Sequence, residues 1–190
     1  MIRNQSKTCI LTLFIKNARM KVTRFFWYGF FALVIVLNGC AEAPTYPLEP
    51  VIEFKSLNRS EILQSRSGAV SQIDTLIITF SFTDGDANLG DEDSLNIFMT
   101  DSRDGFTQSF KINPIPQLGS GDGIAGDIAI KLTNDPNLKN FCCTFPNTPL
   151  TCIASEEYPV DEMFYTIQIR DRAGNLSNTI QTDPIQILCQ

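Results

Sequence analysis

Apolar residues recur at every second position over much of the chain, and this period restricts the fold more than any other feature. Leu76, Ile78, Phe80 and Phe82 share one side of a predicted strand, and hydroxyl-bearing residues alternate with them from position 79 on. Alternate side chains of a strand point to opposite faces, so the pattern predicts a strand that is buried on one face. No stretch combines helical spacing with capping residues. The sequence therefore predicts an all-β protein.

The same alternation predicts five further strands, separated by turns rich in glycine, aspartate and asparagine. Short strands with turns of this kind indicate an antiparallel β-sandwich. A first strand is also expected at residues 51–54. The alternating sets are Leu95, Ile97 and Met99; Phe106, Phe110 and Ile112; Ile128, Ile130 and Leu132; Met163, Tyr165, Ile167 and Ile169; and Ile185, Ile187 and Cys189.

An uncharged apolar run, residues 25–37, precedes this pattern. A transmembrane helix needs ~20 apolar residues, whereas the apolar part of a signal peptide needs ~7–15, which fits this run. Lys21 and Arg24 supply the positive charge that precedes such a run, and Met20 opens the unit. We therefore expect residues 1–19 to be a start-site artefact. The alternative is an uncleaved anchor or a buried helix.

The run ends in Leu37-Asn38-Gly39-Cys40, which resembles the lipobox of a bacterial lipoprotein signal peptide. That resemblance implies a signal peptide over residues 1–39, acyl chains on Cys40 and an outer-membrane location, facing either the periplasm or the exterior. The proline-rich residues 40–50 would then form a lipidated, extended tether. The lipid bilayer is the partner expected through Cys40.

Removal of residues 1–39 changes the charge balance of the chain. The removed segment has six basic residues and no acidic one, so 9 basic and 21 acidic residues remain, a net charge of −12. Nucleic acid is excluded as a partner, because its phosphates need a basic surface. Electrostatic docking on anionic lipid is disfavoured for the same reason. Residues 51–190 are numerous enough for one domain with its own core.

Two segments near the end of the chain resemble a known domain family. Residues 161–167 resemble the corner that enters strand F of immunoglobulin domains, with Ile167 in place of the family's cysteine. Residues 169–175 are similar to the F–G turn of bacterial immunoglobulin-like and fibronectin type III-like modules. The resemblance implies a single immunoglobulin-like antiparallel β-sandwich over residues 51–190. Residues 134–160 depart from the family pattern, and we interpret them as an insertion before strand F.

Four cysteines lie beyond the expected lipidation site, and an exported chain is in a compartment where disulfides persist. A bridge between the adjacent Cys142 and Cys143 would be strained. One of these two is therefore expected to pair with Cys152 and the other with Cys189, which would staple residues 134–160. The alternative is a zinc site of all four cysteines, but the spaced cysteine pairs usual in such sites are missing.

The densest acidic cluster of the chain follows the strand that begins near residue 76. Asp84, Asp86 and Asn88 offer oxygen ligands at alternate positions, as a hard cation such as Ca²⁺ requires. The spacing is not that of an EF-hand, because Leu89 and Leu95 occupy the positions of its glycine and its glutamate.

The topology of a β-sandwich adds a second argument for a cation. The loops that follow residues 75–83 and 163–170 would emerge at the same end of the domain. Asp171 and Asn175 would then approach the acidic cluster, and we expect a calcium site with ligands from both loops. The alternative is two unrelated turns, since Asp and Asn are ordinary turn residues.

Catalysis has little support in the sequence. The chain has no histidine, the usual general base, and nothing places two carboxylates across a cleft. Residues 121–126 spell G-x-G-x-x-G, but a strand pattern follows, so they are not a dinucleotide-binding motif. We expect a non-enzymatic lipoprotein that binds or scaffolds an unknown protein or glycan.

Two alternatives to a general binding module remain. One is a glycan-binding accessory subunit of an outer-membrane nutrient-uptake system, and the other, less favoured, is a hydrolase that uses paired carboxylates. The only tryptophan, Trp27, lies in the expected leader. A glycan platform would therefore depend on exposed rings such as those of Phe98 and Tyr158.

Overall fold

The computed structural model describes residues 45–65, 73–116, 123–146 and 152–190, which belong to one compact unit. The expected signal peptide and Cys40 lie outside this part of the chain. The described residues contain no helix long and apolar enough to cross a membrane. They form the strands β1 (Val51–Leu57), β2 (Glu61–Leu63), β3 (Thr75–Asp84), β4 (Ile97–Asp101), β5 (Thr107–Phe110), β6 (Ile124–Thr133), β7 (Val160–Met163), β8 (Tyr165–Ile169), β9 (Ile180–Gln181) and β10 (Ile185–Leu188).

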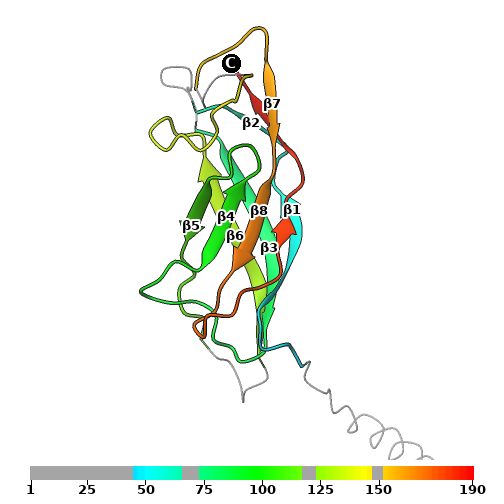
Figure 1. Ribbon diagram of the computed structural model, residues 1–190, viewed down its shortest axis with the longest axis vertical. Helices are drawn as coiled ribbons and strands as arrows, with labels where there is room; N and C mark the ends of the chain where they lie inside the picture. The colour runs from blue at the N-terminus through cyan, green and yellow to red at the C-terminus, as the bar shows by residue number, and fades with distance from the viewer. Residues whose placement is uncertain (1–44, 66–72, 117–122, 147–151) are drawn as a thin grey trace, which may run out of the picture. The chain divides into compact units, whose positions relative to one another are not determined.

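The described strands form three sheets, two of which lie face to face as layers (Figure 1). One layer has the strand order β1-β3-β6 and the other the order β5-β4-β8-β9. The third sheet, β2-β10-β7, lies at the end of the domain that carries the C-terminus. The chain is therefore an all-β sandwich, which confirms the fold class predicted from the alternation.

The core of the sandwich is built on β3, the middle strand of the first layer. Its side chains alternate between half-buried and buried along all 10 residues. Leu76, Ile78 and Phe80 have no exposed surface, and they meet Met99 and Ile167 of the second layer in one apolar cluster. Burial of this apolar surface is the main favourable term in folding. The strict alternation of the sequence is thus the direct signature of a strand with one face on the core.

Strands β2 and β9 were not predicted, because 3 and 2 residues are too few to show a period. Only one side chain of β2, that of Ile62, is fully buried. β2 pairs in parallel with β10, whereas the other strand pairs of the described chain are antiparallel. The sandwich therefore contains one short parallel pair beside its antiparallel ones.

Two residues that the alternation assigned to the core are exposed, so this part of the prediction is wrong. Leu95 is 51% exposed and Phe106 is 62% exposed, and each precedes its strand. Hydrogen bonds of Asn96 explain why Leu95 lies outside β4. Its backbone N–H donates to the Phe110 carbonyl, and its Oδ1 accepts from the backbone N–H of Ile112 at 2.6 Å. An amide side chain thus replaces a ladder bond, and β4 begins only at the next residue.

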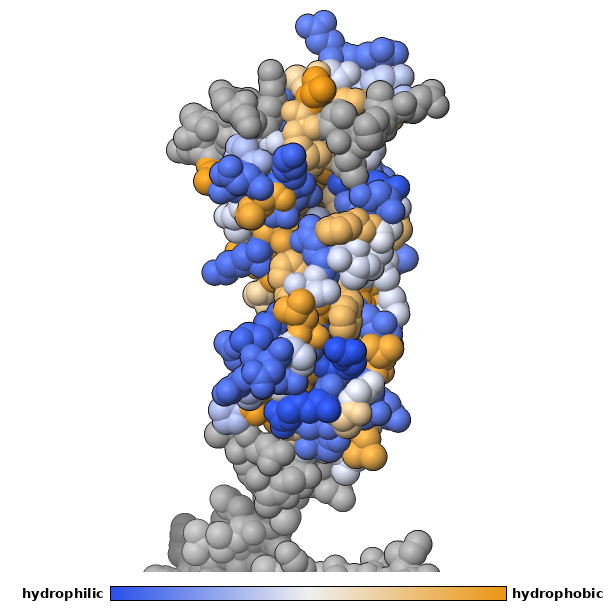
Figure 2. Space-filling view, turned by 60° about the vertical axis from the view of Figure 1, so that its left-hand side comes forward, coloured by the Kyte–Doolittle hydropathy of each residue, from blue (hydrophilic) through white to orange (hydrophobic). Residues whose placement is uncertain are grey.

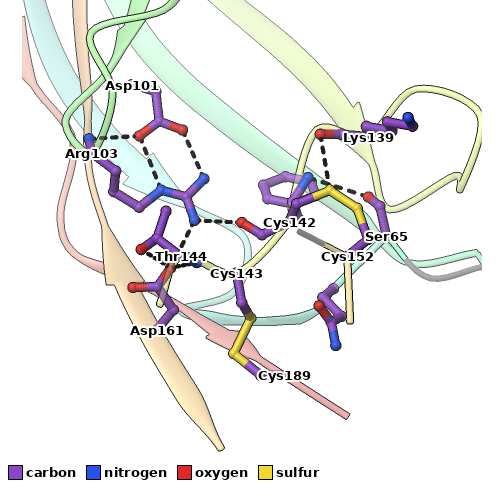
Figure 3. Close-up of a disulfide and its surroundings, with 12 residues drawn as sticks. Ser65, Asp101, Arg103, Lys139, Cys142, Cys143, Thr144, Cys152, Asp161 and Cys189 are labelled. Atoms are coloured by element: carbon purple, nitrogen blue, oxygen red, sulfur yellow. Dashed lines mark hydrogen bonds and ion pairs between the residues drawn. A yellow bond between two sulfur atoms is a disulfide. The ribbon is translucent and has the colours of Figure 1, made fainter. Parts of the chain in front are cut away.

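Two disulfides constrain the long connection after β6: one closes a loop within it, and the other fastens it to the rest of the domain (Figure 3). Cys142 is bonded to Cys152, 10 residues away, and Cys143 to Cys189, 46 residues away. This arrangement settles the pairing that the sequence left open, and it uses the four sulfurs that a zinc site would need. Cys143 and Cys189 are buried, so their bridge holds the C-terminal end of β10 against the core.

A buried arginine lies beside these disulfides (Figure 3). The side chain of Arg103 is 7% exposed, and it binds Asp101 and Asp161 at 2.8 and 2.9 Å. Its Nη1 also donates to the Cys142 carbonyl at 2.7 Å. Burial alone would lower the pKa of Arg103, but the bonds and charges of the two carboxylates outweigh it and raise the pKa. The guanidinium thus joins the end of β4, the stapled connection and β7.

Candidate metal site

Three carboxylates from two loops meet at one end of the sandwich. Asp84 is the last residue of β3, Asp86 follows in the same loop, and Asp171 lies just beyond β8. One carboxylate oxygen from each of the three lies within 4.8 Å of the others. Asp84 and Asp171 are buried, with 0% and 6% exposure, and Asp86 is exposed. The two loops therefore meet as the topology argument predicted, and the site opens to solvent on the side of Asp86.

Asn88 holds the first loop in a tight turn around the carboxylates. Its backbone N–H donates to Asp84 Oδ2 at 2.9 Å, and its Nδ2 donates to Asp86 Oδ2 at 2.7 Å. Gly90 completes the turn with a φ of 87°, and a Cβ there would lie 2.3 Å from the Asn113 carbonyl oxygen. Only glycine satisfies both the backbone conformation and the space at this position.

Asn175 fixes the second loop by binding Asp171 rather than the other carboxylates. Its backbone N–H donates to Asp171 Oδ1 at 2.7 Å, and its Nδ2 donates to Asp171 Oδ2 at 2.8 Å. Arg172 joins the two loops, because its backbone N–H donates to the Asn88 carbonyl and its Nη1 donates to the Gly90 carbonyl at 2.9 Å. The sequence predicts Asn175 as a ligand; in the structure its side-chain nitrogen orients Asp171.

Two buried oxygens of the site have no hydrogen-bond partner within the described chain, Asp84 Oδ1 and Asn88 Oδ1. Buried polar atoms are nearly always paired, so each exception calls for an explanation. Burial and the neighbouring charge of Asp86 raise the pKa of Asp84 to about 6, although the backbone bond from Asn88 lowers it in part. Both unpartnered atoms are oxygens, which are the ligands that a hard cation takes.

The N-terminal end of the described chain packs against the same loop. The Gly85 N–H donates to the Pro47 carbonyl at 2.7 Å, and a Cβ on Gly85 would lie 2.4 Å from the carbonyl oxygens of both Tyr46 and Pro47. Pro50 is buried just before β1 begins. This part of the expected tether is therefore docked on the domain. The sequence contains no signal for it, because the contact is made by backbone atoms.

The other candidates singled out in the sequence do not join this cluster. Phe98 is half-buried beneath Arg170, whose guanidinium carbon lies 5.2 Å from the ring centroid. Tyr158 packs against Phe145 with ring centroids 5.8 Å apart. The planes of these two rings are tilted by 33° to one another. Of the glycine-rich motif, residues 121–122 lie outside the described chain, and Gly123 leads directly into β6.

Comparison with known proteins adds no assignment: no family model matches this chain, and no curated protein is significantly similar to it.

Proposed function

We propose that this chain is a membrane-anchored lipoprotein whose immunoglobulin-like β-sandwich binds calcium and serves as a non-enzymatic binding or scaffolding module. One observation carries the calcium proposal: Asp84 Oδ1 is buried and unpartnered beside two further carboxylates. Carboxylates this close repel one another, and a divalent cation between them replaces that repulsion by attraction.

The proposed ligands are carboxylate oxygens of Asp84, Asp86 and Asp171 and the amide oxygen of Asn88. Calcium takes 6–8 oxygen ligands in a flexible geometry, so water or backbone carbonyls would complete the set. Magnesium demands a regular octahedron and gives up its water reluctantly, which two irregular loops suit less well. Asn175 acts as a positioning residue, since its backbone nitrogen and its side-chain nitrogen both donate to the Asp171 carboxylate.

Calcium is expected to raise the Tm of the chelator-treated protein by about 5–10 °C at about a hundredfold excess over its Kd. Asp84→Asn should abolish this shift, because it removes the most deeply buried charge of the site. Asp93→Asn is the matched control, since it removes one charge from the same loop outside the cluster. Thermal melting with calcium and with magnesium measures both effects. A shift of the same size in Asp84→Asn would contradict the site.

The same substitution should change how the stability of the calcium-free protein depends on pH. The pKa of Asp84 is raised from 3.8 to about 6, so the folded state holds this proton more tightly than the unfolded state does. The free energy of unfolding should therefore fall as the pH rises from about 4 to about 6. Asp84→Asn should remove that decline, which urea unfolding of the calcium-free protein at several pH values would measure. An unchanged pH profile would contradict this electrostatic account.

The anchoring part of the proposal rests on the segment Leu37-Asn38-Gly39-Cys40. Cys40→Ala is expected to move the protein from the membrane fraction to the soluble fraction and to abolish incorporation of a labelled fatty acid. Cys9→Ala is the matched control, because Cys9 precedes the proposed start at Met20. Fractionation and fatty-acid labelling in a bacterial host measure both outcomes. Equal labelling of the Cys40→Ala variant would contradict the proposed lipidation.

The strand order supports the immunoglobulin-like part of the proposal. In immunoglobulin domains, strands A, B and E form one sheet, and strand C pairs with F, and F with G, in the other. The orders β1-β3-β6 and β5-β4-β8-β9 correspond to these, with β5 in the place of C′. The described chain enters the domain beside Gly85, so the anchor would join the domain at its calcium end. The surface of the domain away from this end would then be available to bind the partner.

A further inference from the structure

Apolar surface runs along the side of the domain that carries β5, between polar flanks (Figure 2). A groove of about 260 Å³ lies on this side, lined by the β5 region and β6. Ile97 and Ile130 are its buried floor, and Phe110, Ile112 and Ile128 are half-buried along it. Apolar side chains packed against the core thus remain partly open to solvent along this groove.

The groove is the seam between the two layers, because β6 ends one layer and β5 ends the other. The opposite seam is bridged by Asn178 beside β1. Its Oδ1 accepts from the Ile52 N–H at 2.8 Å, and its Nδ2 donates to the Ile52 carbonyl at 2.9 Å. On the groove side, Asn140 bridges only the end of the seam: its Nδ2 donates to the Thr133 carbonyl at 3.0 Å, and its Oδ1 accepts from the Gln108 side chain at 3.5 Å. Within the described chain, no such side-chain contact reaches the backbone of residues 128–131 of β6 or of residues 107–109 of β5. These strands therefore present free edges, which offer backbone donors and acceptors to an added strand.

Two lysines that line the groove have no acidic partner in the described part of the chain. Lys131 is exposed, and Lys111 reaches only a backbone carbonyl, that of Glu92, at 3.1 Å. The nearby acidic residue of β6, Asp127, is already paired with Lys55 at 2.7 Å. The groove thus combines an apolar floor with positive charge that is not neutralised, on a domain that is acidic elsewhere.

We propose that this seam accepts an extended, acidic segment of a partner protein as an added strand. An extended segment places alternate side chains in the groove while its backbone pairs with a free edge. Apolar side chains would cover Phe110, Ile112 and Ile128, and acidic side chains would reach Lys111 and Lys131. Backbone pairing would supply affinity, and the charges would select the partner.

A second copy of this chain is a poorer occupant of the seam. A two-fold dimer brings the same patch of both copies together, so Lys111 and Lys131 would face the lysines of the other copy. Like charges opposite one another destabilise strand pairing, and lysine on an edge is a common protection against self-association. The charge of the groove therefore favours an acidic partner over a dimer.

A synthetic peptide that alternates valine with glutamate is the direct probe, added to the full chain in detergent solution. Saturable binding is expected by fluorescence anisotropy, with slower amide hydrogen exchange in β5 or β6. The same peptide with its glutamates replaced by lysine, or with alternate amides N-methylated, should bind more than about tenfold more weakly. Absence of saturable binding would overturn the proposal, and so would protection confined to other strands.

Lys131→Glu should weaken binding of the acidic peptide about fivefold, because a favourable charge pair becomes a repulsive one. Arg59→Glu is the matched control: it changes the net charge equally, and Arg59 is engaged with Asp74 away from the groove. It should alter binding less than about twofold. Equal losses in both variants would show a general charge effect and contradict the groove. Dimerisation that excludes the peptide, detected by sedimentation equilibrium, would identify a second copy as the occupant and also overturn the proposal.

Discussion

Arg103→Met is expected to lower the free energy of unfolding by about 3–5 kcal/mol, although methionine is apolar and of similar length. The substitution leaves the carboxylates of Asp101 and Asp161 unpaired, and their side chains are only 12% and 15% exposed. The Cys142 carbonyl also loses a donor. Buried charges without a partner are among the costliest defects in a folded protein. Urea unfolding of both proteins at neutral pH measures the loss.

Two controls separate the charge from the packing of Arg103. Arg103→Lys keeps the charge but loses the planar fork that binds two carboxylates, so an intermediate loss is expected. Adding Asp161→Asn to Arg103→Met should recover part of the loss, because one unpaired charge disappears. If Arg103→Met lowers the free energy of unfolding by less than about 1 kcal/mol, the ion pairs contribute no more than exposed ones do. That result would contradict the role of Arg103 as a buried link between β4, the connection and β7.

The difference in the free energy of unfolding between the unmodified protein and Arg103→Met should become smaller as the pH falls. Burial alone would raise the pKa of Asp161, but hydrogen bonds from Thr144 and Arg103 outweigh burial and lower it. A carboxyl with a lowered pKa stabilises the fold above its ordinary pKa, and this contribution is lost as the pH falls through the folded value. The variant lacks the Arg103 part of this contribution, so its stability should fall less on acidification.

Removal of the Cys143–Cys189 bridge is expected to cost about 4 kcal/mol, from the loop of 46 residues that it closes. The Cys142–Cys152 bridge closes a loop of only 10 residues, and its removal should cost about 3 kcal/mol. Cys143 and Cys189 are also buried, so their replacement by alanine loses packing as well. The longer bridge should therefore be the more important one.

Each bridge is best removed as a pair of alanines, because a single substitution leaves a reactive thiol. The variants Cys143→Ala/Cys189→Ala and Cys142→Ala/Cys152→Ala serve as controls for one another in urea unfolding without reductant. An equal or larger loss in the second variant would contradict the expected order. It would place the main constraint in the connection after β6 rather than at the end of β10.

Periodicity identified the strands that bury one face over several residues. β3 and β8 alternate along their full length, and the apolar residues that the alternation assigns to one face are in the core. Leu95 was assigned wrongly because periodicity cannot show that Asn96 replaces a ladder bond by its side chain. The strands β2 and β9 are defined by their neighbours in the sheets, which sequence pattern alone does not contain.

The acidic site was partly predictable because topology relates loops that lie far apart in the sequence. The end of β3 and the end of β8 had to lie at the same end of a sandwich, which brought Asp171 to Asp84. The burial of Arg103 had no such signal, because a charged residue in a turn is usually solvated. Its partner Asp161 is 58 residues away, and only the folded chain shows that the two meet.

Calorimetric titration of the chelator-treated protein with calcium tests the central claim most directly. At neutral pH we expect one calcium per chain, a weaker affinity near pH 5 because Asp84 then holds a proton, and loss of the binding heat in Asp84→Asn. Asp93→Asn should bind as the unmodified protein does. Absence of binding heat in the unmodified protein, or unchanged binding in Asp84→Asn, would contradict a calcium site at the end of β3.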